Sequence, residues 1–159
     1  MNERPVRRCA LSVEQWRVLT QEGMNIPVRI RLAGNSMWPL IRIDRDHVTV
    51  VPLRRPLQRG DIVLFADNLG RYVVHRVWKL DEDCVITLGD HCVVPDAPLR
   101  HDQVWGLVTK LERGSRVIDL DTPAARLYGR FWMGTLPLRR VYDLALNFAR
   151  RIYRKLKGR

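Results

Sequence analysis

The sequence lacks a long apolar run, because no stretch of its 159 residues approaches the roughly 18 consecutive apolar positions of a transmembrane helix. The N-terminal stretch MNERPVRRCALSVEQW has basic residues but no apolar core after them, unlike a signal peptide. We therefore expect a cytoplasmic protein with neither a membrane-spanning segment nor a signal peptide. Its 46% hydrophobic and 28% charged residues are typical of a folded domain and exclude a disordered chain.

Cysteine is scarce as well. Cys9, Cys84 and Cys92 are odd in number and have no CxxC spacing, which favours a reduced protein over a disulfide framework. Cys92 lies beside His91, and His101 follows, but no second ligand pair accompanies them. The sequence therefore predicts neither a metal site nor a cofactor.

Acidic residues are nearly absent from the C-terminal part of the chain. Residues 123–159 hold ten Lys or Arg and one acid, Asp143, and so contribute +9 of the formal net charge of +11. Residues 23–122 are nearly neutral, with 14 basic and 13 acidic groups. This distribution predicts a localised electrostatic contact of the tail, not a basic domain that grips a duplex.

The tail also has the pattern of an amphipathic helix that opens at Pro137. Apolar residues recur at three- and four-residue steps, and the basic residues lie largely off that stripe. The stripe consists of Leu138, Val141, Tyr142, Ala145, Phe148, Ala149, Ile152, Tyr153 and Leu156. Such a helix is typical of peripheral contact with an anionic membrane, here through residues 137–159 on the inner face. Two alternatives stay open: the helix packs on its own body, or it binds RNA or a partner protein.

The rest of the chain predicts a mainly β protein. Ser12 and Gln15 form a capping-box pattern that opens a short helix over residues 12–22. Short β-type runs separated by turn residues follow, with a hairpin turn at 67–70. The expected strands cover 28–34, 47–53, 61–66, 71–80, 84–90, 103–112 and 116–121. We thus expect an N-terminal arm with a short helix (1–25), a β-rich domain (26–122) and a basic amphipathic helical tail (123–159).

A candidate for catalysis is Ser36, within GNSMWPLI, although small residues and proline are equally ordinary in a turn. A serine hydroxyl needs a base to remove its proton, and histidine suits that task because its pKa lies near neutrality. His75 lies in the strand pattern YVVHRVWKL, and Asp90 and Asp96 lie in LGDHCVVPD, where one could orient the histidine. Taken alone, His75 also fits a core histidine.

Lysine is the rival base, and the chain has few of them. Lys79 lies four residues beyond His75 on the same strand face, roughly 13 Å away at the usual rise of a strand. Both residues therefore cannot serve one serine. We expect Lys79 to be a solvated strand end.

Five motifs together resemble a known family. GNSMWP, RGDIVLF, YVVHRV, LGDHCVVPD and VWGLV follow, in order and spacing over residues 26–113, the pattern of the S24/S26 serine peptidases, which include signal peptidase I and the LexA-type repressors. Bacterial signal peptidases and LexA-type proteins use a Ser-Lys dyad. Archaeal and endoplasmic-reticulum signal peptidases use Ser-His-Asp, with the histidine in a VHRV box and the aspartates in a GD…D box. This sequence resembles the second form.

The resemblance implies a LexA/signal-peptidase-like β-fold with a catalytic site. It implies Ser36 as nucleophile, His75 as general base and Asp96 as the residue that orients it. Asp90 matches the supporting aspartate of the GD box, and backbone N–H groups at the serine turn would help to form the oxyanion hole. With 35 residues before Ser36, we expect neither the usual membrane anchor nor the DNA-binding domain of a LexA-type repressor.

The sequence therefore predicts a serine endopeptidase that cleaves a peptide or protein substrate. The alternative is a non-catalytic binding or regulatory module on the same fold, which its basic tail tethers to an anionic membrane or to nucleic acid. A complete Ser/His/Asp set favours the enzyme.

Overall fold

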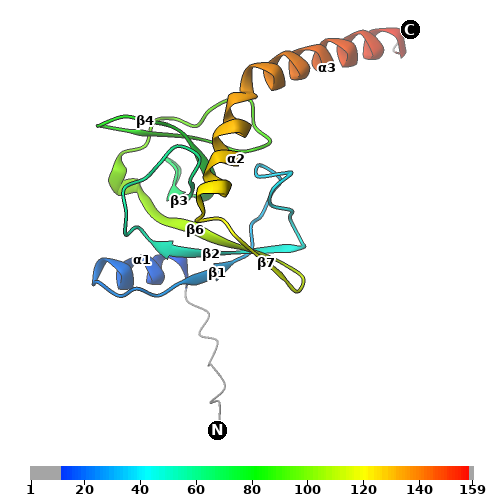
Figure 1. The fold of residues 1–159 in the computed structure, drawn as a ribbon. Helices are drawn as coiled ribbons and strands as arrows, with labels where there is room; N and C mark the ends of the chain where they lie inside the picture. The colour runs from blue at the N-terminus through cyan, green and yellow to red at the C-terminus, as the bar shows by residue number, and fades with distance from the viewer. Residues whose placement is uncertain (1–11, 158–159) are drawn as a thin grey trace.

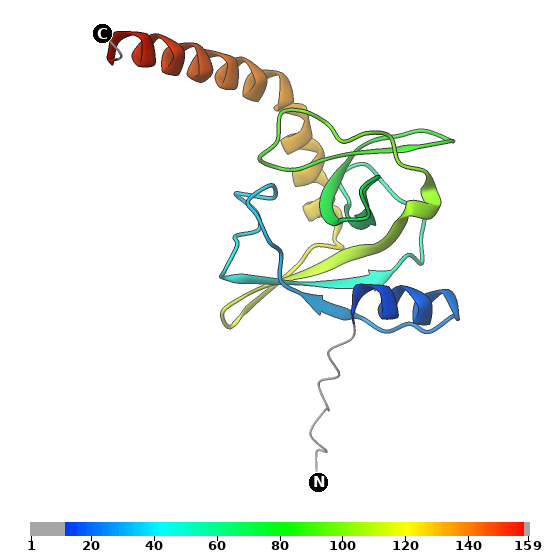
Figure 2. The same cartoon turned by 180° about the vertical axis from the view of Figure 1, so that it is seen from behind.

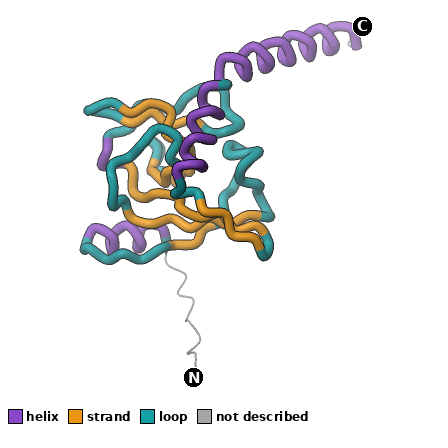
Figure 3. The backbone as a smooth tube through the Cα atoms, in the orientation of Figure 1, coloured by secondary structure: helices purple, strands orange, loops and turns teal. Residues whose placement is uncertain are grey.

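The computed structural model describes residues 12–157, and of Lys155 and Leu156 only the backbone. An antiparallel sheet forms the body, a short helix lies at its N-terminal side, and two helices follow it (Figure 1, Figure 3). The strands are β1 (Val28–Ile30), β2 (Asp46–Pro52), β3 (Ile62–Ala66), β4 (Tyr72–Leu80), β5 (Val85–Leu88), β6 (Val104–Arg113) and β7 (Arg116–Asp119). Cys9 and the expected arm over residues 1–11 lie outside the described residues.

The seven predicted strands are confirmed. They form one sheet in the order β1-β2-β6-β3-β4-β5, with β7 paired to β6, and every pairing is antiparallel. The hairpin turn at 67–70 joins β3 to β4, where Gly70 has a positive φ of 73° that suits glycine. Strand β1 is shorter than expected: it ends at Ile30, and residues 31–34 continue without a partner strand.

The two faces of β3 belong to two of the three apolar cores in the described residues. Residues Ile62–Phe65 are all buried, unlike the alternating pattern of β2, because side chains on both faces of β3 meet apolar neighbours. Ile62 and Leu64 belong to a core that contains Trp16, whereas Val63 and Phe65 belong to a second core.

The predicted N-terminal helix is confirmed as α1 (Val13–Gln21), with both hydrogen bonds of the Ser12–Gln15 capping box. Its Trp16 is fully buried, and the indole Nε1 donates to the carbonyl of Ile26 at 2.6 Å. This one side chain therefore attaches α1 to the sheet beside β1 (Figure 2).

The helix expected to open at Pro137 corresponds to α3 (Leu136–Lys157), and a separate helix, α2 (Pro123–Gly134), precedes it in the tail. Thr122 caps α2 by accepting from the backbone N–H of Ala125, and Pro123 occupies the first turn. Helix α3 extends away from the sheet, as both views show (Figure 1, Figure 2). Its apolar stripe is exposed wherever side chains are described, so the structure does not support packing of that stripe on the body. No helix within residues 12–157 combines the length and the apolarity that crossing a bilayer requires.

Candidate active site

The serine turn is fixed to the core by the residues that follow Ser36. Met37 and Ile41 are each 2% exposed, and the N–H of Ile41 donates to the carbonyl of Met37 at 2.9 Å. The carbonyl of Ser36 accepts from the N–H of His91 at 2.8 Å, which binds the turn to the loop after β5. Ser36 itself is half-buried.

Strand β4 places His75 beside Asp96. The His75 Nδ1 and an Asp96 carboxylate oxygen, Oδ2, are 2.6 Å apart. A neutral ring that donates its Nδ1 proton to this carboxylate has an unprotonated Nε2, which can accept a proton from a substrate or a nucleophile. Phe65 packs against the ring with its plane tilted by 61°, and His75 is only 7% exposed. The Asp96 carboxylate and the Phe65 ring therefore both fix the orientation of the imidazole.

Sequence reasoning missed Thr87 of β5. Its hydroxyl donates to the same Asp96 Oδ2 at 2.6 Å, and its carbonyl accepts from the Asp96 N–H at 2.9 Å. Thr87 is fully buried, so the backbone and the carboxylate of Asp96 are both held to β5. The available signal in the sequence was a polar residue within an apolar strand pattern. Its partner Asp96 follows nine residues later, beyond a loop, so the sequence did not connect the two.

Asp90 does not contact His75 through a hydrogen bond; its carboxylate binds Arg76 instead. The Arg76 Nε and Nη2 donate to its two oxygens at 2.8 and 2.7 Å, and both side chains are at most 2% exposed. Arg76 Nη1 also donates to the carbonyl of Gly60 at 2.8 Å. This doubly hydrogen-bonded pair is strongly interdependent, since removing either partner would leave an unpaired buried charge.

Gly89 brings the backbone of Ser36 and the ring of His75 together. A Cβ placed on Gly89 would lie 2.7 Å from the Ser36 carbonyl oxygen and 3.0 Å from His75 Nε2. Only a residue without a side chain allows this approach. Among the described residues the Ser36 hydroxyl makes no hydrogen bond to His75. Hydrogen bonds between catalytic groups are often long in a free enzyme and shorten when substrate binds.

Ser36 and His75 line the same cleft, of about 670 Å³. Residues 30–34 and residues 72–75 of β4 contribute to its lining, as do Val13 of α1 and Leu64 of β3. The lining is rich in aliphatic side chains, namely Val13, Ile30, Leu32, Leu64, Val73 and Val74, and it also includes Arg31 and Arg71. A second cleft, of about 320 Å³, is lined by His75 together with Asp96. His75 thus lines both clefts.

The two C-terminal helices hold the loop between Gly89 and Asp96. The carbonyl of Asp90 accepts from Trp132 Nε1 at 2.9 Å and from Arg139 Nη1 at 2.6 Å. Burial lowers the pKa of the Arg139 guanidinium, which nevertheless stays charged at neutral pH. The position of this loop therefore depends on residues near the junction of α2 and α3.

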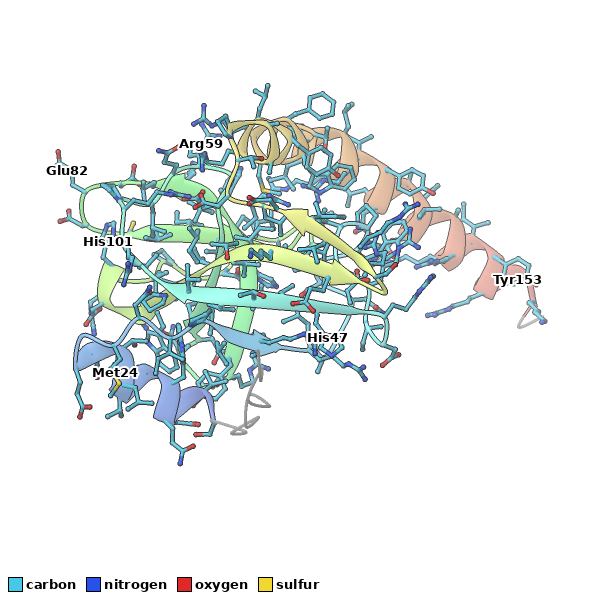
Figure 4. All side chains as sticks on the ribbon, turned by 60° about the horizontal axis from the view of Figure 1, so that its bottom comes forward. Met24, His47, Arg59, Glu82, His101 and Tyr153 are labelled. Carbon is cyan, nitrogen blue, oxygen red and sulfur yellow. The ribbon has the colours of Figure 1, made fainter. Side chains whose placement is uncertain are left out.

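Lys79 and His101 do not line either cleft, whereas Cys92 lies next to Gly89. Lys79 is exposed, and its ammonium lies 4.7 Å from the centre of the Trp78 ring. Burial raises the pKa of the Cys92 thiol, which keeps it protonated and unreactive near neutral pH. His101 lies on the surface (Figure 4). Within residues 12–157, no three His, Cys, Asp or Glu side chains gather as metal ligands would.

Comparisons of the chain with protein-family models, with curated proteins and with solved structures found no match. A functional assignment therefore depends on the geometry and chemistry of these side chains.

Proposed function

We propose that the protein is a serine endopeptidase with a LexA/signal-peptidase-like fold. The observation that carries this proposal is the 2.6 Å contact between His75 Nδ1 and Asp96, made by a histidine that lines one cleft with Ser36. This contact supports an oriented base in the same cleft as a potential nucleophile, which is what covalent catalysis by serine requires.

In the proposed reaction the Ser36 Oγ attacks the carbonyl carbon of a peptide bond, while His75 Nε2 takes the hydroxyl proton. Asp96 stabilises the imidazolium that forms. When the C–N bond breaks, His75 returns the proton to the leaving amine and an acyl-serine remains. Water, deprotonated by His75, then attacks the acyl carbon; the bond to Ser36 Oγ breaks, His75 returns the proton to that oxygen, and the carboxylic acid product leaves.

The cleft favours an extended substrate with aliphatic side chains. Residues 31–34 follow β1 without a partner strand, so their backbone groups are available to a substrate strand. The aliphatic lining supplies surface for apolar side chains, and Ser36 follows directly in the chain. This arrangement supports cleavage next to small or aliphatic residues.

The test compares new protein N-termini by mass spectrometry in cells that express the wild type or Ser36→Ala. Ser115→Ala is the matched control, because Ser115 is exposed in the turn between β6 and β7. We expect a set of N-termini that the wild type and Ser115→Ala share and that Ser36→Ala lacks. These termini would also reveal the cleavage motif.

Identical N-termini in all three strains, with each variant folded and abundant, would contradict the proposal. They would favour the alternative, a non-catalytic binding module on the same fold. His75→Ala gives an independent check, since hydrolysis should fall by orders of magnitude while any membrane binding stays unchanged.

A further inference from the structure

Helix α3 exposes an apolar surface along most of its length. With about 3.6 residues per turn, its apolar side chains spread over roughly half of the helix circumference. Of these, seven are 44–73% exposed: Leu138, Val141, Tyr142, Leu144, Phe148, Ile152 and Tyr153. Tyr153 lies near the far end of α3, away from the sheet (Figure 4). An apolar surface of this extent on a folded protein indicates an interaction site.

The opposite half of α3 is basic. Arg140, Arg150, Arg151 and Arg154 are exposed on it. The only acidic residue of the helix is Asp143, whose carboxylate accepts a hydrogen bond from Asn147 at 3.0 Å. The described part of the chain therefore leaves the arginines beyond the second turn without an acidic partner. Their long side chains can bend toward a negatively charged surface.

The first turns of α3 are fixed to the body. Leu136 is 3% exposed, Arg139 donates to the carbonyls of Asp90 and Cys92, and Arg140 Nε donates to the carbonyl of Val93 at 2.9 Å. These contacts hold the base of the helix, while the rest extends outward (Figure 1). The projecting turns present both halves of the helix at once.

We propose that α3 binds the surface of an anionic lipid bilayer, with its axis parallel to the membrane plane. A helix in this orientation buries its apolar half among the acyl chains and keeps its arginines at the level of the lipid phosphates. The tyrosines at the margins of the stripe suit the boundary between the two regions. This inference does not depend on peptidase activity.

Other binding partners would account for only one of the two halves of the helix surface. Nucleic acid would contact the arginines and leave the apolar half in water. A second copy of α3 would form a narrower seam, since two paired helices bury a stripe and not half of each circumference. A bilayer accounts for the width of the apolar surface and for the sign of the charge together.

The test is co-sedimentation of the full chain with vesicles of phosphatidylglycerol and phosphatidylcholine, or of phosphatidylcholine alone. We expect binding to the anionic vesicles that weakens as salt is added. Phe148→Ser with Ile152→Ser should weaken binding about tenfold or more, because two anchoring side chains are lost. Arg150→Gln with Arg151→Gln and Arg154→Gln should weaken it by up to about a hundredfold, at about fivefold per charge.

Val117→Ser is the matched control, because Val117 is an apolar residue of β7 that is 63% exposed. The Val117→Ser variant should bind the anionic vesicles as the wild type does. The variants change exposed side chains, so their melting temperatures should equal that of the wild type. No sedimentation with anionic vesicles would overturn the proposal. Loss of binding in Val117→Ser equal to that in the α3 variants would overturn it as well. So would a chain that binds RNA or dimerises through α3 but does not bind lipid vesicles.

Discussion

The α-carbon of Gly89 lies so close to Ser36 that a methyl group on it would be 2.7 Å from the Ser36 carbonyl oxygen. The same methyl group would lie 2.8 Å from Cys92 Sγ and 3.0 Å from His75 Nε2. Glycine at this position therefore leaves room for the serine turn, Cys92 and the histidine ring to lie close to one backbone position.

This relationship predicts that Gly89→Ala strongly reduces peptide hydrolysis. The methyl group must displace a backbone carbonyl, which shifts Ser36 away from His75, and a displacement of about 1 Å can lower a rate by about a hundredfold. Turnover of a substrate peptide and the melting temperature are the measurements.

Gly134→Ala is the control for that substitution, because a Cβ at residue 134 meets no atom within 4 Å. It should leave turnover unchanged and stabilise α2 slightly. Full activity of a folded Gly89→Ala variant would contradict the role of Gly89 in spacing the site.

The two aspartates should differ in what their replacement costs. Asp96→Asn removes the carboxylate that orients His75, so kcat should fall by about three to four orders of magnitude. Asp90→Asn leaves Arg76 buried without its counter-charge and should lower the free energy of unfolding by about 3–5 kcal/mol. Kinetics and urea denaturation of both variants separate the loss of activity from the loss of stability. If Asp90→Asn lost activity and Asp96→Asn lost stability, the roles of the two aspartates would be exchanged.

Thr87 should act through Asp96. Thr87→Val keeps the shape of the side chain but removes the hydrogen bond to Asp96 Oδ2, and a bond to a charged acceptor is worth about 1.5–3 kcal/mol. We expect kcat to fall about tenfold and KM to change little. Thr87→Ser keeps the hydroxyl and should restore most of the activity; equal activity in Thr87→Val and the wild type would exclude this role.

Acid should destabilise the fold partly through Asp46. Hydrogen bonds from Arg113 at 2.9 and 2.6 Å lower the pKa of the Asp46 carboxyl below its ordinary value. The unfolded chain, with a pKa of about 3.9, binds a proton at a pH where the folded chain does not. The stabilisation is therefore complete above about pH 5 and is lost as the pH falls through the lowered pKa of the folded state.

Urea denaturation of the wild type and Asp46→Asn at several pH values measures this contribution. The difference in the free energy of unfolding should be large at pH 6 and should shrink toward pH 3. A difference that does not change with pH would mean that Asp46 and Arg113 stabilise the fold through packing and not through their charges.

Local patterns in the sequence predicted most of the fold. Alternation in HVTVVPL and the turn residues at 67–70 predict strands because they depend on neighbours along the chain. The capping box at Ser12 is similarly local. Strand β1 was predicted too long, since its end depends on where β2 stops pairing with it. Helix α2, which precedes the helix expected at Pro137, was not predicted as an element of its own; its start signal, Thr122 followed by Pro123, lies next to the expected end of the β-rich domain.

The candidate site was predictable in part. The resemblance of five motifs selected Ser36, His75, Asp90 and Asp96, and the structure brings His75 and Asp96 into contact. Nothing in the spacing of residues distinguishes Asp90 from Asp96 as the partner of His75. The structure distinguishes them because Arg76 binds one and Thr87 binds the other.

The sequence by itself determined the types and approximate limits of the strands and the amphipathic pattern of α3. These features follow from side-chain periodicity and residue chemistry, which the order of residues contains directly. Only the tertiary structure decided that the apolar side of α3 is exposed and that Gly89 lies against both Ser36 and His75. Both depend on tertiary packing. Segments that are distant in the sequence supply the atoms around each side chain, and local sequence patterns do not show which segments these are.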